Sequence, residues 1–355
     1  MAQTFGLIGG AWRGEFFLRI ARDLPEQFPL AGVVVRDGEK RERLRAAWDV
    51  PVFATVEELL AKAKPAFVVT SVSWASNLPL MEFLATQNVP VLSETPFAPA
   101  LEDLHRVVEL AKSGARIQLA EQYLFQPMHA ARLKLVRDGR LGTIYEADVS
   151  YAHGYHGISL LRNYLQTGLR LPKITARKFK SRIMAGPGRE GGPKEKAIID
   201  TERTIAQFDY GDRLGIFDFA AHQYFSWIRS PRLMVRGEEG EINNSHVRLL
   251  KDFQTPIDFT LHRQETGQEA NLEGRHLRAI VGGGEIIYQN PFAPARWSDD
   301  EIAVATCLSK MMTFVETGES FYGVAEGCHD RYLDILIDEA VKSGGTVEAT
   351  AQPWS

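Results

Sequence analysis

The sequence predicts an α/β fold in two parts: a doubly wound parallel sheet over residues 1–122, then an α+β domain over residues 123–355. The second part is expected to contain a large, mostly antiparallel open sheet. Three features carry this prediction. Residues 4–21 have the pattern of a strand, a glycine turn and a helix, and apolar and helical runs then alternate to residue 120. Beyond residue 122, short turns separate strand-like runs.

The elements expected in the first part alternate regularly along the chain. Strands are predicted at 4–8, 31–35, 66–70, 89–93 and 116–120, and helices at 15–21, 39–48, 57–62, 78–85 and 101–111. Several of these strands are continuously apolar, as is typical of strands buried on both faces. Ligands of such a sheet bind outside the carboxyl ends of its strands.

The second part combines helices with hairpins. Helices are predicted at 127–137, 157–165, 300–316 and 322–342, and strands at 143–151, 201–210, 214–220, 232–236 and 241–243. A loop rich in Gly, Pro and charge is expected at 185–196. The basic residues before it (Lys173, Arg177, Lys178, Lys180 and Arg182) indicate either a solvated face or recognition of an acidic or phosphorylated substrate, with the loop as a lid.

Composition excludes several classes of protein. The chain has 355 residues, 45% hydrophobic and 24% charged, with a formal net charge of -4. This balance indicates no nucleic-acid or anionic-membrane partner. Cys307 and Cys328 lie outside any metal-ligand spacing, which favours a reducing compartment. The first residues read as a strand, and no apolar run approaches ~18 residues, so we expect a cytoplasmic protein with no membrane span.

The glycine turn is the strongest single motif. Gly9 and Gly14 occupy the first and third places of a Gly-x-Gly-x-x-Gly pattern, and Ala11 occupies the second. In a strand–turn–helix setting this pattern is typical of a Rossmann domain, in which backbone N–H groups at the helix start hold a dinucleotide pyrophosphate. Trp12 and Arg13 lie on the same turn, where they are expected to cover the cofactor and to approach the pyrophosphate.

The end of the second strand bears on the choice of cofactor. An acidic residue usually binds the ribose hydroxyls there, but Arg36 stands at the expected place, followed by Asp37. An arginine can pair with a 2′-phosphate, which favours NADP over NAD. Lys40 and Arg41 lie one turn further and are placed to assist. Asp37 remains able to reach the ribose, so NAD stays open.

Four further motifs carry a resemblance to a known family. They are Thr70-Ser71-Val72-Ser73, Ser93-Glu94-Thr95-Pro96, the turn Arg140–Ile144 and the segment Arg236–Ile242. In order and spacing they resemble the Gfo/Idh/MocA oxidoreductases. The resemblance implies an NAD(P)-binding Rossmann domain, a sugar or polyol substrate, hydride transfer at a carbinol carbon, and a homodimer or homotetramer through the open sheet. It also implies that Ser71, Glu94 and Thr95 approach the cofactor.

The sequence departs from this family at its catalytic positions. Thr95 stands where the family has the Lys of Glu-Lys-Pro. His156 matches the His of the family's Asp-x-x-x-His pair, whereas Ala152 replaces the Asp and Asn77 replaces another common His. The departure indicates either a rewired site or a protein that has lost hydride chemistry.

The segment around His156 is nevertheless the best candidate for catalysis. His153, Tyr155 and His156 lie within one helical turn, and a neutral imidazole can take a proton from an alcohol near pH 7. We therefore expect His156 to be the general acid or base, with His153, Tyr155 and Thr95 around the reacting oxygen. The alternative is structural hydrogen bonding at a helix start. No third ligand with defined spacing supports a metal site.

Three residues are expected to contact substrate. Glu121 and Tyr123 follow the last strand of the first part, at its carboxyl end, and Arg162 lies on the helix after His156. Alternatively, Glu121 pairs with Arg162 or another base.

The sequence thus predicts an NAD(P)-dependent oxidoreductase acting on a sugar-like or polyol alcohol. Two alternatives remain. One is a non-catalytic protein that binds NAD(P) or a sugar. The other is an enzyme that uses a tightly bound cofactor catalytically, in epimerisation or hydrolysis.

Overall fold

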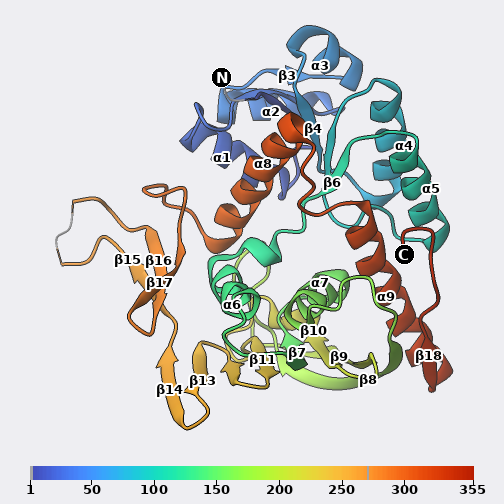
Figure 1. The fold of residues 1–355 in the computed structure, drawn as a ribbon. Helices are drawn as coiled ribbons and strands as arrows, with labels where there is room; N and C mark the ends of the chain where they lie inside the picture. Colours follow the sequence, from blue (N-terminus) through green and yellow to red (C-terminus); the bar gives the residue numbers. More distant parts are fainter. Residues whose placement is uncertain (1–2, 270–271) are drawn as a thin grey trace.

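The computed structural model describes residues 3–269 and 272–355. Its ribbon shows a blue-to-cyan N-terminal sheet with its helices above a green-to-yellow C-terminal sheet (Figure 1). Two C-terminal helices, in orange and red, return to the N-terminal half (Figure 1). Both predicted parts of the fold are therefore present.

The N-terminal sheet is parallel, in the order β3-β2-β1-β4-β5-β6. Its strands are β1 (Phe5–Ile8), β2 (Leu30–Val34), β3 (Val52–Phe53), β4 (Phe67–Thr70), β5 (Val91–Ser93) and β6 (Ile117–Leu119). The connecting helices are α1 (Gly14–Asp23), α2 (Gly38–Trp48), α3 (Val56–Ala63), α4 (Trp74–Thr86) and α5 (Leu101–Lys112). The strand order reverses between β1 and β4, and a crevice at such a switch point is the usual ligand site.

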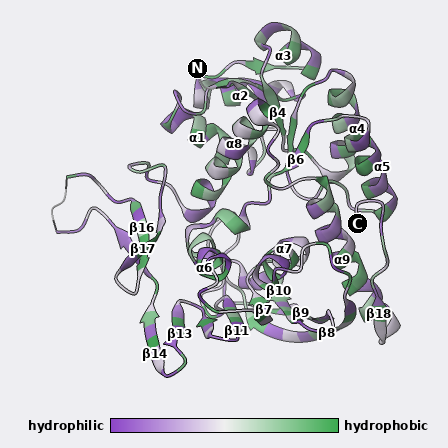
Figure 2. Ribbon diagram, in the orientation of Figure 1, coloured by the Kyte–Doolittle hydropathy of each residue, from purple (hydrophilic) through white to green (hydrophobic). Residues whose placement is uncertain are grey.

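Burial explains why these strands are apolar without alternation. Every residue of β1 and β4 is buried, because helices cover both faces of the sheet. In Figure 2, β4 and β6 are coloured as hydrophobic, whereas α4 and α5 carry hydrophilic residues as well. The predicted doubly wound sheet is confirmed.

The C-terminal sheet is mixed and mostly antiparallel, in the order β14-β13-β12-β11-β7-β10-β9-β8-β18. Its strands are β7 (Ile144–Ser150), β8 (Lys173–Met184), β9 (Ile198–Asp209), β10 (Leu214–Ala220), β11 (Arg232–Gly237), β12 (Gly240–Asn243), β13 (His246–Asp252), β14 (Thr255–Thr260) and β18 (Thr346–Glu348). The pair β7–β10 is parallel. The short helix η1 (Tyr123–Phe125) and the helix α6 (Pro127–Arg137) come before β7 in the chain. Helix α7 (Gly154–Leu165) lies between β7 and β8 in the chain.

Several strands escaped the sequence analysis. The basic run lies on β8, which pairs with β9 along its whole length. Most of β8 is exposed and carries charged side chains, so its sequence lacks the apolar alternation by which a strand is predicted. Two of its lysines form surface ion pairs with Glu348, Glu202 and Asp338. Also unpredicted were β13, β14 and the separate three-stranded sheet of β15 (His262–Glu265), β16 (Leu277–Gly282) and β17 (Glu285–Gln289).

The last two helices tie the halves of the molecule together. Helix α8 (Asp299–Thr317) packs against α1, and α9 (Val324–Ser343) packs against α5 and α7. Glu301 of α8 accepts a hydrogen bond from Arg19 of α1 at 2.5 Å. A capping box between Ser298 and Glu301 starts α8 beside the glycine turn. The division of the chain at residue 122 stays a prediction.

Candidate active site

A cavity of about 1380 Å³ runs along the carboxyl ends of the parallel strands to the start of α7. The glycine turn, the end of β2, the segment after β4 and the segment after β5 line one side. The other side is formed by residues from η1, α7 and later loops. Among the predicted site residues, the cavity is lined by Gly9, Ala11, Trp12, Arg13, Arg36, Asp37, Ser71, Glu94, Thr95, Tyr123, His153, Tyr155 and His156.

Close backbone packing holds the glycine turn in place. Gly9 has φ +107°, and a Cβ atom there would lie 1.9 Å from the carbonyl oxygen of Ser71. A Cβ atom on Gly14 would lie 2.6 Å from the carbonyl oxygen of Gly9. Helix α1 begins at Gly14 immediately after the turn. The glycines therefore bring a helix N-terminus to the cavity, where backbone N–H groups favour an anion.

Arg13 joins the turn to two acidic residues. Its guanidinium lies 2.9 Å from Asp300 Oδ2, at the start of α8, and 3.9 Å from Glu94 Oε1. Burial raises the pKa of Glu94 to about 7, with Arg13 opposing the shift. Trp12 is 38% exposed and packs edge-on against Phe16. No local pattern pointed to Asp300, since 287 residues separate it from Arg13.

The far end of the cavity carries basic and acidic side chains. Arg36, Asp37 and Lys40 line it around the start of α2, and Glu57 lines it from α3. The Asp37 carboxylate caps that helix by accepting a hydrogen bond from the backbone N–H of Lys40 at 2.7 Å. Arg41 is directed elsewhere, because its guanidinium donates to the carbonyl oxygens of Val35 and Arg36.

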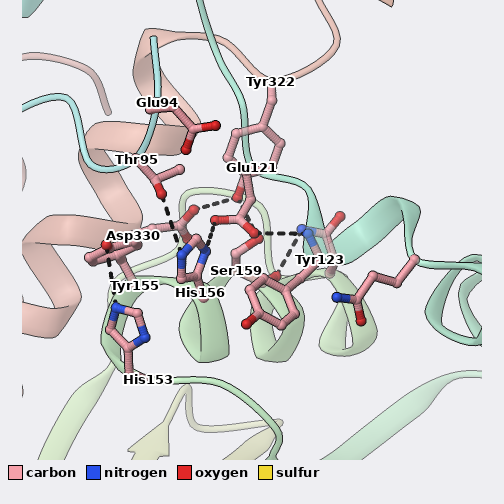
Figure 3. Close-up of polar contacts among 12 residues, drawn as sticks. Glu94, Thr95, Glu121, Tyr123, His153, Tyr155, His156, Ser159, Tyr322 and Asp330 are labelled. Atoms are coloured by element: carbon pink, nitrogen blue, oxygen red, sulfur yellow. Dashed lines mark hydrogen bonds and ion pairs between the residues drawn. The ribbon is translucent and has the colours of Figure 1, made fainter. Parts of the chain in front are cut away.

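Thr95, His156 and Glu121 form a continuous chain of polar contacts (Figure 3). Thr95 Oγ1 lies 3.3 Å from His156 Nε2, and His156 Nδ1 lies 2.6 Å from Glu121 Oε2. Glu121 is held in turn by the backbone N–H of Tyr123, which donates to Oε1 at 3.2 Å. Glu121 therefore pairs with His156, and not with Arg162.

Burial acts on both members of the Glu121–His156 pair. It raises the pKa of Glu121 to about 8 and lowers the pKa of His156 to about 3. Both shifts favour the neutral form, because a charged side chain is costly to bury away from water. Near pH 7 the pair thus holds a protonated carboxyl next to a neutral imidazole. The arrangement can pass a proton between the buried carboxyl and the Thr95 hydroxyl.

His153 and Tyr155 form a second polar group, packed against the His156 ring. His153 Nδ1 lies 2.6 Å from the hydroxyl of Tyr224, which also accepts a hydrogen bond from the His153 backbone N–H at 2.9 Å. His153 Nε2 lies 3.4 Å from the Tyr155 hydroxyl. Tyr123 donates to Tyr224 at 3.3 Å. Burial, followed by the charges of His156 and Arg189, lowers the pKa of His153 to about 3, so it too is neutral.

Two predicted positions have structural roles. Arg162 is buried and pairs with Asp330, and it also donates to the carbonyl oxygen of Gly168 at 2.7–2.9 Å. It does not line the large cavity. Asp330 accepts a further hydrogen bond from Tyr322 (Figure 3). Asn77 is buried and bridges Thr70, Ser93 and the carbonyl oxygen of Phe97, which fixes the ends of two strands.

The sequence analysis missed several residues that line the cavity. Arg189, from the loop between β8 and β9, joins Tyr224 and Phe225, which follow β10, and Asp300. Their signal was weak, because each lies in a segment remote from every recognised motif. The glycine- and proline-rich loop was the one available indication for Arg189.

The described residues also bear on metal binding and membrane insertion. Within 3–269 and 272–355, no three His, Cys, Asp or Glu side chains gather in a way that could hold a metal ion. Over the same ranges, none of the helices combines the length and the apolar character that a bilayer crossing requires. Cys307 and Cys328 are buried free thiols.

A family model matches the N-terminal third of the chain. Residues 3–121 match the Gfo/Idh/MocA model, described as an oxidoreductase family with an NAD-binding Rossmann fold. The resemblance stated from the sequence is confirmed. The chain is also 26% identical over 119 residues to YteT of Bacillus subtilis (strain 168), which is named as a candidate oxidoreductase. That alignment covers 32% of this chain and 28% of YteT, so the match spans about a quarter of the relative.

Solved structures resemble the whole chain. Levoglucosan dehydrogenase, in complex with NADH and levoglucosan, has a TM-score of 0.71 at 13% identity, covering 99% of this chain and 100% of that chain. A myo-inositol dehydrogenase from Corynebacterium glutamicum has a TM-score of 0.67 at 15% identity, with coverage of 99% and 100%. WlbA dehydrogenase from Bordetella pertussis, in complex with NADH and UDP-GlcNAcA, reaches 0.64 at 15% identity, with coverage of 99% and 100%. At these identities the similarity shows the fold.

Proposed function

Because residues 3–121 carry the NAD-binding Rossmann domain of the Gfo/Idh/MocA oxidoreductases, we propose that this chain transfers hydride between a nicotinamide cofactor and a sugar-like or polyol alcohol. The observation that carries the proposal is the Thr95–His156–Glu121 chain at the carboxyl ends of the parallel strands. The named ligands of the structural neighbours, levoglucosan among them, support a carbohydrate substrate.

The residues present fit a dinucleotide. The turn at Gly9 and Gly14 leaves no room for a Cβ atom and brings the N-terminus of α1 to the cavity, as a pyrophosphate requires. Arg36 and Lys40 would hold the adenosine end, and Glu94 would lie toward the nicotinamide end, beside Thr95. When bound, the nicotinamide supplies the acceptor or donor of hydride. The protein supplies orientation, exclusion of water and the proton.

Thr95 takes the place of the family lysine in this mechanism. Its hydroxyl would form a hydrogen bond with the substrate oxygen. The same hydroxyl also lies within hydrogen-bond distance of His156 Nε2. In carbonyl reduction, the neutral imidazole donates through Thr95 to the forming alkoxide, and Glu121 replaces the proton at Nδ1. In alcohol oxidation the same steps run in reverse and require Glu121 to be ionised. General acid–base catalysis of this kind contributes about 10²- to 10⁴-fold.

Tyr155 and His153, which pack against the His156 ring, would support the same oxygen. Tyr224 receives a hydrogen bond from the His153 backbone, which leaves its own hydroxyl hydrogen for His153 Nδ1. His153 Nε2–H then faces the Tyr155 hydroxyl. This network orients Tyr155 next to Thr95, where it completes the polar surface for a substrate hydroxyl. The Thr95–His156–Glu121 chain, which we call the relay, is intact. It therefore favours the catalytic alternative over a protein that only binds NAD(P) or a sugar.

Arg36 and Lys40 favour NADP over NAD in this proposal. Both line the cavity at the end of β2, whereas the Asp37 carboxylate is engaged in capping α2. A 2′-phosphate at this end would meet two cations, one of them able to bond it with a planar fork of N–H groups. A bare ribose would lack the usual acidic partner.

Ligand-dependent thermal unfolding tests the proposal first. Saturating NADPH or NADH, at about 100 times its dissociation constant, should add about 2.7 kcal/mol of stability. A polyol and sugar screen with the preferred cofactor should then detect hydride transfer. The variant His156→Ala should keep the cofactor shift and lose turnover, while His246→Ala, at a half-buried histidine of β13 outside the cavity lining, should lose neither.

Two results would contradict the proposal. One is the absence of a shift with either nucleotide in protein shown to carry no bound nucleotide. The other is unchanged turnover in His156→Ala, which would remove His156 from the mechanism.

A further inference from the structure

The hairpin formed by β8 and β9 projects a structured tip. The two strands pair from Lys173 and Asp209 to Met184 and Ile198, and the backbone N–H of Ala185 then donates to the carbonyl oxygen of Ala197 at 2.8 Å. At the tip, Gly188 and Gly191 exchange two backbone hydrogen bonds of 2.9 and 3.1 Å. Arg189 and Glu190 occupy the turn between these glycines. The loop therefore presents Arg189 on an ordered turn.

This tip reaches the glycine turn of the N-terminal half. The Arg189 guanidinium lies 4.5 Å from the centre of the Trp12 indole ring. Arg189 also lines the large cavity, together with His153 and Tyr224. The lowered pKa of His153 is due first to burial, then to His156, and last to the charge of Arg189. The cation thus lines the cavity that contains the Thr95–His156 relay, at the side of the glycine turn.

The other ionisable side chains around the relay have partners. Arg13 is paired with Asp300 and lies 3.9 Å from Glu94, and the Glu121 carboxyl is bonded to His156. Among residues 3–269 and 272–355, by contrast, Arg189 forms no ion pair, and its guanidinium stacks on Trp12. A guanidinium stacked on an indole keeps its edge N–H groups free and held in one plane. That geometry matches the two oxygens of a carboxylate or a phosphate.

We propose that Arg189 binds an anionic group of the substrate, so that the alcohol oxidised or formed at this site belongs to an acidic sugar or polyol, carrying a carboxylate or a phosphate. The proposal rests on the oxidoreductase function proposed above and specifies its substrate class. The basic run on β8 has no part in it, because none of its five residues lines the cavity.

The cofactor pyrophosphate is a second anion that the Arg189 guanidinium could bind in the same way. Trp12 belongs to the glycine turn, which places Arg189 within the same end of the cavity as that pyrophosphate. The substrate is favoured because the tip that carries Arg189 also packs on the segment after Tyr224, where a Cβ atom on Gly186 would lie 3.8 Å from Ser226 Cα. Tyr224 is in turn bonded to His153, beside the relay. An experiment must therefore measure both ligands separately.

Binding of matched acidic and neutral sugars provides the test. Dissociation constants are measured by calorimetry, with and without saturating cofactor, for D-glucuronate against D-glucose, D-galacturonate against D-galactose, and D-glucose 6-phosphate against D-glucose. The variants are Arg189→Gln, Arg189→Lys and the control Arg182→Gln, an exposed arginine of the same hairpin outside the cavity lining. The affinities of each protein for NADH and NADPH are recorded in parallel.

We expect at least one acid to bind wild-type protein about tenfold or more tightly than its neutral partner. A hydrogen bond to a charged group contributes enough binding free energy for an affinity difference of about this size. Arg189→Gln should abolish that preference, Arg189→Lys should keep part of it, and Arg182→Gln should keep all of it. Cofactor affinity should change less than about twofold in every variant.

Three outcomes would overturn the assignment of Arg189. They are no acid preference in wild-type protein, an acid preference retained by Arg189→Gln, and a tenfold loss of cofactor affinity in Arg189→Gln with the preference intact. The last would assign Arg189 to the pyrophosphate. Failure of wild-type protein to bind NADH or NADPH is a separate result, and it would contradict the oxidoreductase function instead.

Discussion

Thr95 Oγ1 lies 3.3 Å from Nε2 of His156, although 61 residues separate the two in the chain. The first follows a strand of the N-terminal sheet, and the second lies on α7, which packs on the C-terminal sheet. The relay on which the proposed chemistry depends is therefore assembled across the junction between the two sheets.

Replacing Thr95 tests the relay directly. Thr95→Ala removes the hydroxyl that joins substrate to His156, so kcat should fall by about 10² or more. Thr95→Ser retains the hydroxyl and should stay within about tenfold of wild type. Steady-state kinetics with the cofactor selected by thermal unfolding provide the measurement. A gain of activity in Thr95→Lys would instead indicate a decayed family site and contradict the relay.

The protonation state of Glu121 should set opposite pH profiles for the two directions of reaction. Burial raises its pKa to about 8, so the carboxyl is protonated below that pH and ionised above it. Oxidation needs the ionised form and should rise with pH up to about 8, then level off. Reduction needs the protonated form and should decline above about 8.

Initial rates between pH 6 and 10 measure both profiles. The inflection near 8 should vanish in Glu121→Gln, which cannot ionise. It should persist in Glu94→Gln, which removes the neighbouring carboxyl whose pKa burial raises to about 7. An inflection near 8 that survives in Glu121→Gln would assign it to another group.

Gly9 should tolerate no side chain. Its φ of +107° would strain any other residue, and an added Cβ atom would lie 1.9 Å from the Ser71 carbonyl oxygen, which is a backbone clash. Gly9→Ala should lower the free energy of unfolding by about 2–4 kcal/mol and abolish nucleotide binding. Gly114→Ala is the matched control, because Gly114 has φ +100° with nothing within 4 Å. It should cost only about 1–2 kcal/mol.

Asp330 should matter for stability and not for substrate affinity. Asp330→Asn would leave the guanidinium of Arg162 buried without its counter-charge, at a cost of about 3–5 kcal/mol in denaturant unfolding. KM should remain unchanged, since Arg162 lies outside the large cavity. Asp212→Asn, which breaks the exposed pair with Arg170, should change stability little. A raised KM in a stably folded Asp330→Asn would restore a substrate role for Arg162.

Arg36 should control the choice between cofactors. Arg36→Ala removes one of two cations at the adenosine end of the cavity and should weaken NADPH about tenfold, leaving NADH unchanged. The exposed Arg43, which lies on α2 shortly after Arg36 and is paired with Glu39, offers a control through Arg43→Ala. Equal effects on NADH and NADPH in Arg36→Ala would discard its proposed role at the 2′-phosphate.

The sequence predicted most elements of the parallel sheet because their signals are local. Buried strands are continuously apolar, and the glycine turn lies where strand and helix meet. Strands such as β8 were missed because exposed residues leave their charges visible, which hides the alternation. The same limit applies to β13–β17, which lie beyond any recognised motif.

By itself, the sequence determined the Rossmann half, the approximate position of the cavity and the histidines beside it, since each depends on residues close together in the chain. Only the tertiary structure decided which groups meet. It paired Glu121 with His156 instead of Arg162, and it brought Asp300 to Arg13 and Arg189 to Trp12. Such contacts join segments separated by tens to hundreds of residues, and their partners depend on how the sheets and closing helices pack, which no local pattern encodes.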